Sequence, residues 1–115
     1  MILAIVGSRS LNINITGFVP QGVKAIVSGG ALGIDTAAEN FAREHNLPIR
    51  IFKPNYFAFG KIAPILRNKQ IVKAADRILA IWDGKSKGTF HTIKFSYILK
   101  KPITIFVICD QYVKK

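Results

Sequence analysis

Short apolar runs alternate with segments of helical periodicity along this chain. Apolar runs of this length are typical of buried strands, and the longer segments place apolar residues on one side of a helix. Such alternation predicts an α/β fold, a Rossmann-like three-layer sandwich with a mainly parallel five-stranded sheet and helices on both faces. The strands are expected at Ile2–Val6, Lys24–Val27, Pro48–Phe52, Arg77–Trp82 and Pro102–Ile108, and the helices at Thr36–His45, Ile62–Ala75 and Thr89–Leu99.

The ends of these elements carry local signals. Thr36 and Glu39 fit a capping box at the first helix, although that helix could also begin near Ala31. Residues 11–22 are irregular and fit either a short helix or a loop. Residues 53–61 predict a loop rich in aromatic residues, which could stack on a base or cover the sheet edge: Tyr56, Phe57 and Phe59.

Polar and glycine-rich motifs follow the predicted strands. In an open parallel sheet, ligands bind outside the carboxyl ends of the strands. We therefore expect a single site at that edge. The motifs are Gly7-Ser8-Arg9, Ser28-Gly29-Gly30, Lys53-Pro54-Asn55 and Asp83-Gly84-Lys85.

The run from Ser28 to Asp35 is the sharpest of these motifs. Its glycines allow a tight turn and a close approach of backbone to ligand, and the helix start behind them favours anions. The run predicts a phosphate or nucleotide cradle. It differs from the dinucleotide fingerprint, whose first glycine would fall at Ser28. Asp35 could accept hydrogen bonds from ribose hydroxyls or cap the helix.

Further side chains are candidates by type and position. Arg9 suits a two-pronged contact with phosphate, and Arg67 would face the anionic group of a ligand. The segment Asp83–Thr89 resembles a phosphate loop without the Walker order, or else a flexible basic turn. His91 is an acid or base candidate by residue type alone, and a surface or half-buried histidine is the favoured interpretation. Trp82, at the end of a strand, is expected in the core.

Composition bounds the class of protein. The 115 residues suit one domain, 1–115, and the net charge of +11 favours polyanionic partners or simply solubility. Cys109 is the one cysteine, so no internal disulfide and no zinc site are expected, and Cys109 is predicted to be a small strand-end residue. Apolar runs are too short for a membrane span, and a strand at Ile2 leaves no room for a signal peptide. We therefore expect a cytoplasmic protein with no membrane partner.

Four motifs in order resemble the SLOG superfamily of Rossmann-like nucleotide-binding proteins: Val6–Arg9, Ser28–Asp35, Arg67-Asn68 and Trp82–Thr89. The resemblance extends from Met1 to about Val107. It is similar both to the DNA-processing protein A (Smf) core and to the stand-alone YspA-related branch. It implies the strand order 3-2-1-4-5, and it points to a homodimer, because superfamily members commonly pair through helices.

The motifs and the resemblance together define a candidate ligand-binding set. No catalytic residue, metal or firm cofactor is assigned, and the expected ligand is a nucleotide or a nucleotide derivative. The set is Gly7, Ser8, Arg9, Ser28, Gly29, Gly30, Gly33, Asp35, Arg67, Asn68, Asp83, Gly84, Gly88 and Thr89.

Three functions compete. A nucleotide-binding module or sensor ranks first. A single-stranded DNA binder like the DNA-processing protein A core ranks second, because the charge and the loop aromatics fit a basic groove with stacking platforms, although this chain is expected to be the bare domain. A LOG-like nucleotide phosphoribohydrolase ranks third. That branch has a Gly-Gly-x-Gly-Thr-x-x-Glu pattern, whereas here Phe90, His91 and Thr92 follow Thr89 and the glutamate is absent. We therefore lean against an enzyme.

Overall fold

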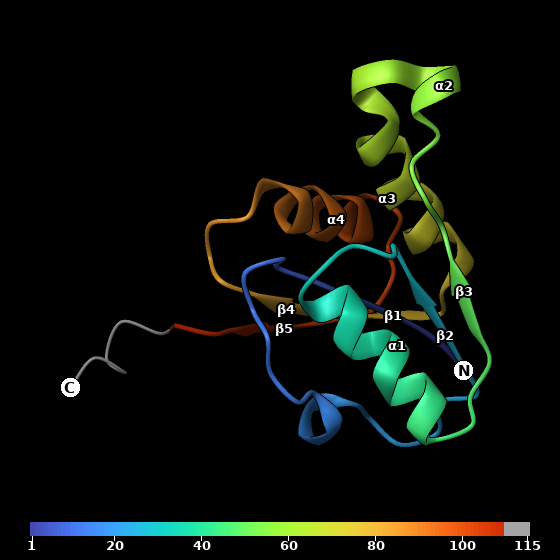
Figure 1. Ribbon diagram of the computed structural model, residues 1–115, viewed down its shortest axis with the longest axis vertical. Helices are drawn as coiled ribbons and strands as arrows, with labels where there is room; N and C mark the ends of the chain where they lie inside the picture. Colours follow the sequence, from blue (N-terminus) through green and yellow to red (C-terminus); the bar gives the residue numbers. More distant parts are fainter. Residues whose placement is uncertain (110–115) are drawn as a thin grey trace.

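A five-stranded, all-parallel sheet forms the centre of the protein, seen in a computed structural model that describes residues 1–109 (Figure 1). The sheet has the order β3-β2-β1-β4-β5, so the expected α/β class is confirmed and the order matches the one that the resemblance implied. The sequence also predicts a frayed tail over residues 111–115, which lie outside the described part. The strands are β1 (Ile2–Gly7), β2 (Ala25–Ser28), β3 (Ile49–Ile51), β4 (Arg77–Trp82) and β5 (Ile103–Val107).

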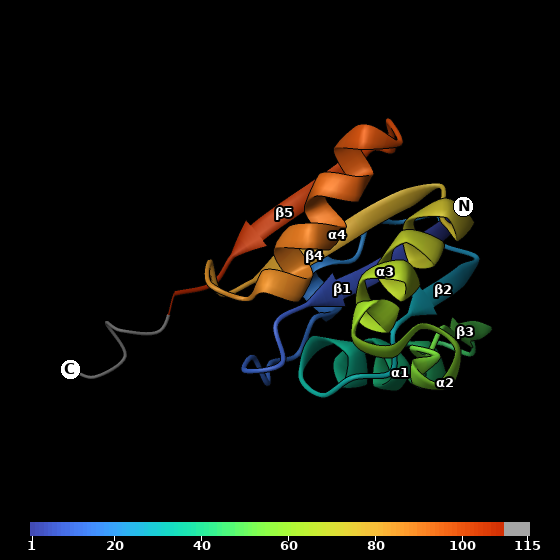
Figure 2. The same cartoon turned by 90° about the horizontal axis from the view of Figure 1, so that it is seen from above.

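Helices cover both faces of this sheet. The helix α1 (Ile34–Glu44) lies on one face, and α3 (Ala63–Ala74) packs beside α4 (Lys87–Ile98) on the other (Figure 2). The irregular segment before β2 contains a short 3-10 helix, η1 (Thr16–Phe18). None of the helices within residues 1–109 combines the length and the apolar character that crossing a membrane requires.

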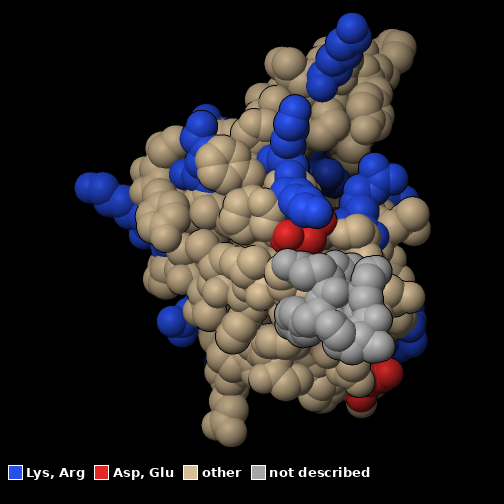
Figure 3. Space-filling model, turned by 90° about the vertical axis from the view of Figure 1, so that its left-hand side faces the viewer, with Lys and Arg blue, Asp and Glu red and all other residues tan. Residues whose placement is uncertain are grey.

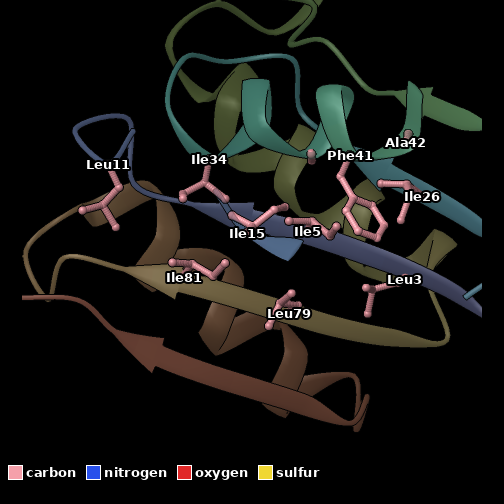
Figure 4. Packing of buried hydrophobic residues seen from close by; sticks show 11 residues of the cluster. Leu3, Ile5, Leu11, Ile15, Ile26, Ile34, Phe41, Ala42, Leu79 and Ile81 are labelled. Atoms are coloured by element: carbon pink, nitrogen blue, oxygen red, sulfur yellow. The ribbon is translucent and has the colours of Figure 1, made fainter. Parts of the chain in front are cut away.

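The central strand β1 supplies both cores, because successive side chains of a strand point to opposite faces. Leu3 and Ile5 join the cluster beneath α1, toward which Ile34 and Phe41 reach from the helix (Figure 4). Alternate residues of β1, such as Val6, belong to the second cluster, under α3 and α4. This double burial explains the continuous apolar run at the start of the sequence.

The first helix begins differently from the capping-box expectation, which is wrong. Its N-cap is Gly33, with φ 73° and no side-chain cap, and the Ile34 N–H donates to the Ser8 carbonyl at 3.3 Å. The Thr36 hydroxyl donates instead to the Ala31 carbonyl at 3.1 Å. Backbone from the β1 loop thus takes the place of a capping side chain.

Helix α4 begins at Lys87, two residues before the expected Thr89, because Ser86 caps it and its hydroxyl accepts the Thr89 N–H at 3.4 Å.

Trp82 is only half-buried, and its indole N–H donates to the Ser86 carbonyl at 3.0 Å. Trp82 still packs against the second core cluster, in partial agreement with the prediction. Cys109 lies two residues after the end of β5 and is exposed.

The aromatic segment after β3 is a projecting arm rather than a plain loop. We define the arm as residues 55–62, which form α2 (Tyr56–Phe59) and the 3-10 turn η2 (Gly60–Ile62) (Figure 1, top). The Asn55 side chain accepts the Ala58 N–H at 3.1 Å and caps α2. Neither short helix has a buried residue, and Phe57 is fully exposed, so Phe57 does not cover the sheet edge.

Candidate functional site

One open cavity of about 780 Å³ lies at the carboxyl edge of the sheet. It is bounded by the loops that follow β1, β2 and β3, by α3 and by the first turn of α4. Residues from three of the four predicted strand-end motifs line this cavity, whereas Asp83-Gly84-Lys85 lies outside the lining. Nine of the candidate residues line this cavity: Gly7, Arg9, Gly29, Gly30, Asp35, Arg67, Asn68, Gly88 and Thr89.

The other five candidates, Ser8, Ser28, Gly33, Asp83 and Gly84, lie outside the lining. The Ser8 hydroxyl is buried and accepts the Asp83 N–H at 2.9 Å, which joins the β1 and β4 loops. A Cβ at Gly33 would collide with the backbone carbonyl of Ser8 and meet that of Arg9 at 2.6 Å. Ser8 and Gly33 therefore hold the neighbouring loops close together behind the cavity.

Arg67 joins three chain segments around the cavity. Its Nη1 donates to the Gly29 carbonyl at 2.6 Å and to the Phe52 carbonyl at 3.2 Å, and its Nε donates to Asn68 Oδ1 at 2.9 Å. Asn68 Nδ2 in turn donates to the Gly88 carbonyl at 3.4 Å. The Nη2 group of Arg67 makes no hydrogen bond to the residues that the structure describes. Arg67 thus positions the glycine loop while keeping donors for an anion.

Asp35 is the one carboxylate among the described residues that line the cavity. Its side chain is buried, and Oδ2 accepts the Ala31 N–H at 3.1 Å. Burial raises the pKa of Asp35, and the Ala31 hydrogen bond and the charge of Arg67 oppose that rise only in part. The Ser28 hydroxyl lies beside this carboxyl group. It is buried, and it forms no hydrogen bond of good geometry with the residues that the structure describes.

Gly29 lies between these two charged groups. A Cβ at Gly29 would be 2.8 Å from Arg67 Nη1 and 3.0 Å from Asp35 Oδ2. Burial lowers the pKa of Arg67, while Asp35 and, to a smaller extent, Tyr56 raise it. The pair therefore places a cation and an acceptor on either side of one glycine, in partly desolvated surroundings where polar contacts are strong.

The loop between β4 and α4 has a defined, hydrogen-bonded conformation. The Asp83 carboxylate accepts the Lys85 and Ser86 N–H groups, both at 2.8 Å, and the Ser10 hydroxyl at 2.9 Å. Burial alone would raise the pKa of Asp83, but these hydrogen bonds outweigh it and lower the pKa to about 2. Asp83 thus organises the loop that presents the first turn of α4, and it does not face the cavity.

Positive charge predominates around the cavity. Of its four charged lining residues, Arg9, Lys53 and Arg67 are cationic and only Asp35 is acidic. Figure 3 shows Lys and Arg side chains gathered on the upper half of the face where the strands end. Within residues 1–109, no three His, Cys, Asp or Glu side chains come together in a way that could hold a metal ion. The arrangement suits an organic anion with hydroxyl groups.

Several lining residues were not in the candidate set. Lys53 and Pro54 follow β3, so their position at a strand end was the available signal, and Tyr56 belongs to the aromatic segment. Thr92 lies one helical turn after Thr89, on the same side of α4. His91 is half-buried and does not line the cavity.

Comparisons of the chain with protein-family models, with characterised proteins and with solved structures gave no match. The resemblance to the SLOG superfamily therefore stays a prediction that rests on the four motifs.

Proposed function

We propose that this protein binds a nucleotide or a nucleotide-derived phosphate ligand in the cavity at the carboxyl edge, as a sensor or binding module. One observation carries the proposal. The lining of a single cavity combines glycine-bearing turns, a helix N-terminus, three cationic side chains and one buried carboxylate. A nucleotide has the matching chemistry, because it joins an anionic phosphate to a hydroxylated sugar.

The phosphate would lie against the glycine loop and the first turn of α4. The first N–H groups of a helix have no partner within the helix and attract anions. The Ser86 hydroxyl accepts the Thr89 N–H, and the Ser86 carbonyl accepts the Phe90 N–H at 3.2 Å. The N–H groups of Lys87 and Gly88 therefore remain for a ligand. Arg9 adds an exposed cation that lines the same cavity.

Asp35 would take the ribose. An ionised carboxylate is a hydrogen-bond acceptor only, so it matches hydroxyl donors and repels a phosphate. Its Oδ2 is already held by the Ala31 N–H, whereas Oδ1 has no partner among the described residues. The ligand would therefore lie with its sugar at Asp35 and its phosphate toward the cationic side.

Binding without hydrolysis fits this site better than phosphoribohydrolase chemistry. Thr92 stands on α4 where the LOG-like pattern has its glutamate, and Asp35, the one carboxylate among the described lining residues, would bind the ribose hydroxyl groups. We expect no release of free base from AMP or cytidine monophosphate at ordinary enzymatic turnover. Base release that disappears in Arg67→Ala would argue for the enzyme instead.

The test is calorimetric titration and thermal shift with a panel of nucleoside mono- and diphosphates. Arg9→Ala should weaken binding about tenfold, the usual effect of losing a hydrogen bond to a charged group. Arg77→Ala is the matched control, since Arg77 is also exposed but begins β4 at the opposite, amino edge of the sheet. Equal losses in the two variants, or no binding of any nucleotide, would refute the proposal.

Single-stranded DNA is the second candidate ligand, and the arm favours it. Phe57 is fully exposed there, Phe59 is half exposed, and Lys61 is beside them, a combination found in sites that stack bases and track phosphates. Anisotropy over a salt series should give a log–log slope of about −0.7 per phosphate contacted. Charge reversal at Lys85 and Lys87 should lower the salt-dependence slope. Phe57→Ala should weaken binding and leave that slope unchanged. No binding at low salt would exclude this candidate.

A further inference from the structure

Tyr56 differs from every other aromatic residue of the arm in its position. It is the arm residue that lines the cavity, whereas Phe57 and Phe59 lie outside the lining. Consecutive residues of a helix point about 100° apart. The short helix α2 therefore aims Tyr56 at the cavity and its neighbour Phe57 at solvent. The sequence alone left both residues with the same two alternatives, base stacking or cover for the sheet edge.

A second observation is that Tyr56 and Arg67 line the same cavity, Tyr56 from the arm and Arg67 from α3. Tyr56 nevertheless keeps 61% of its surface exposed. Much of the ring is thus open at the mouth of the cavity, where a flat group could cover it.

The stem of the arm is held in place. The Phe52 carbonyl accepts a hydrogen bond from Arg67 at 3.2 Å, and the guanidinium of Arg50 lies 4.4 Å from the centroid of the Phe52 ring. Asn55 caps α2 from its side chain, and Pro54 and Pro64, which flank the arm in sequence, are rigid apolar residues that line the cavity. Tyr56 is therefore a preorganised platform, which lowers the entropy cost of stacking.

Resting on the proposed function, we propose that Tyr56 is the base-recognition residue of the site. In this arrangement the aromatic base of the ligand stacks on the Tyr56 ring between Pro54 and Pro64, while the phosphate lies at the glycine loop and the first turn of α4. The ligand is then a nucleotide with an intact base. A phosphorylated sugar without a base lacks the group that the arm recognises.

The experiment compares three probes, AMP, cytidine monophosphate and ribose 5-phosphate, on the full chain by calorimetric titration. The wild-type protein should bind both nucleotides about tenfold or more tightly than ribose 5-phosphate, as expected for one stacked base. Tyr56→Ala should abolish that preference and leave the affinity for ribose 5-phosphate unchanged. Tyr56→Phe keeps the ring and should restore the preference.

Phe57→Ala is the matched control, since it removes an exposed ring from the same four-residue helix on its solvent side. It should bind all three probes like the wild type. Thermal melting of each variant checks folding, which none of them should disturb, because α2 has no buried residue.

The outcomes separate this inference from the proposed function. Equal wild-type affinity for ribose 5-phosphate and the nucleotides would overturn base recognition and leave the anion site standing. A base preference that survives in Tyr56→Ala, or falls equally in Phe57→Ala, would also overturn it, because the base would then bind elsewhere. If none of the probes binds, the proposed function fails and the inference fails with it.

Discussion

Arg67 Nη1 donates a 2.6 Å hydrogen bond to the carbonyl of Gly29, a residue 38 positions earlier in the chain. The same nitrogen reaches the Phe52 carbonyl, so one side chain of α3 connects the ends of β2 and β3. The planar guanidinium can make these bonds and the Nε bond to Asn68 together. The glycine loop is thus shaped from the opposite side of the cavity by a residue remote in sequence.

Arg67→Lys should destabilise the protein although it keeps the charge. A single ammonium group cannot serve both carbonyls and Asn68, so we expect the free energy of unfolding to fall by about 1–3 kcal/mol. Lys69→Ala, an exposed change in the same helix, should stay within about 0.5 kcal/mol of the wild type. Urea denaturation measures both, and indistinguishable midpoints would show that the bridge contributes nothing.

Gly33→Ala and Gly88→Ala should separate glycines needed for folding from glycines that border open space. Gly33 has φ 73° and abuts the Ser8 carbonyl, so an added methyl group should cost at least about 1–3 kcal/mol. A Cβ at Gly88 would meet nothing within 4 Å, and alanine there should raise helix stability by up to about 1 kcal/mol. Thermal melting compares the two. A stable Gly33→Ala protein would contradict the close loop contact.

Asp35→Asn should stabilise the unliganded protein at neutral pH while weakening nucleotide binding. The folded pKa of Asp35 is raised because its ionised form is buried, so ionisation costs stability as the pH rises through that value. The amide oxygen can still accept the Ala31 N–H. The advantage of the variant should be greatest above the raised pKa and vanish below about pH 4, near the ordinary pKa of the group. Denaturation at several pH values tests this, and a variant less stable at neutral pH would refute it.

Asp83→Asn should destabilise the folded protein at neutral pH, which is the opposite of the effect expected for Asp35→Asn. The pKa of Asp83 is lowered to about 2, so its ionised form stabilises the folded state above the ordinary value near pH 4. That contribution is lost as the pH falls from about 4 to about 2. The wild type should therefore exceed the variant in stability at neutral pH, and the difference should close in acid. A constant difference across this range would assign the effect to something other than the charge.

The alternating pattern of the sequence predicted the fold class and the sheet edge at which the candidate cavity lies. Alternating apolar runs and helical segments leave few arrangements other than a parallel sheet between helices, and parallel strands end at the same edge. Gly29, Gly30 and Arg9 could therefore be assigned to one region from local pattern alone. Element ends were predicted less well. Gly33 begins α1 beside the β1 loop, where the Ile34 N–H donates to the Ser8 carbonyl, whereas Ser86 caps α4 through a local contact with Thr89 that the pattern reading missed.

The contacts of each polar residue could be read only from the folded chain. Ser8 and Asp83 belong to strand-end motifs, as Arg9 does, yet both lie outside the cavity lining. The Ser8 hydroxyl accepts the Asp83 N–H, and the Asp83 carboxylate accepts the Ser10 hydroxyl. Arg67 was expected to face an anion, and it also supports the glycine loop. Tyr56 and Phe57 are adjacent in sequence, and only one lines the cavity. The physical reason is common to all of these: local pattern determines secondary structure, whereas burial and partners depend on segments that only folding brings together.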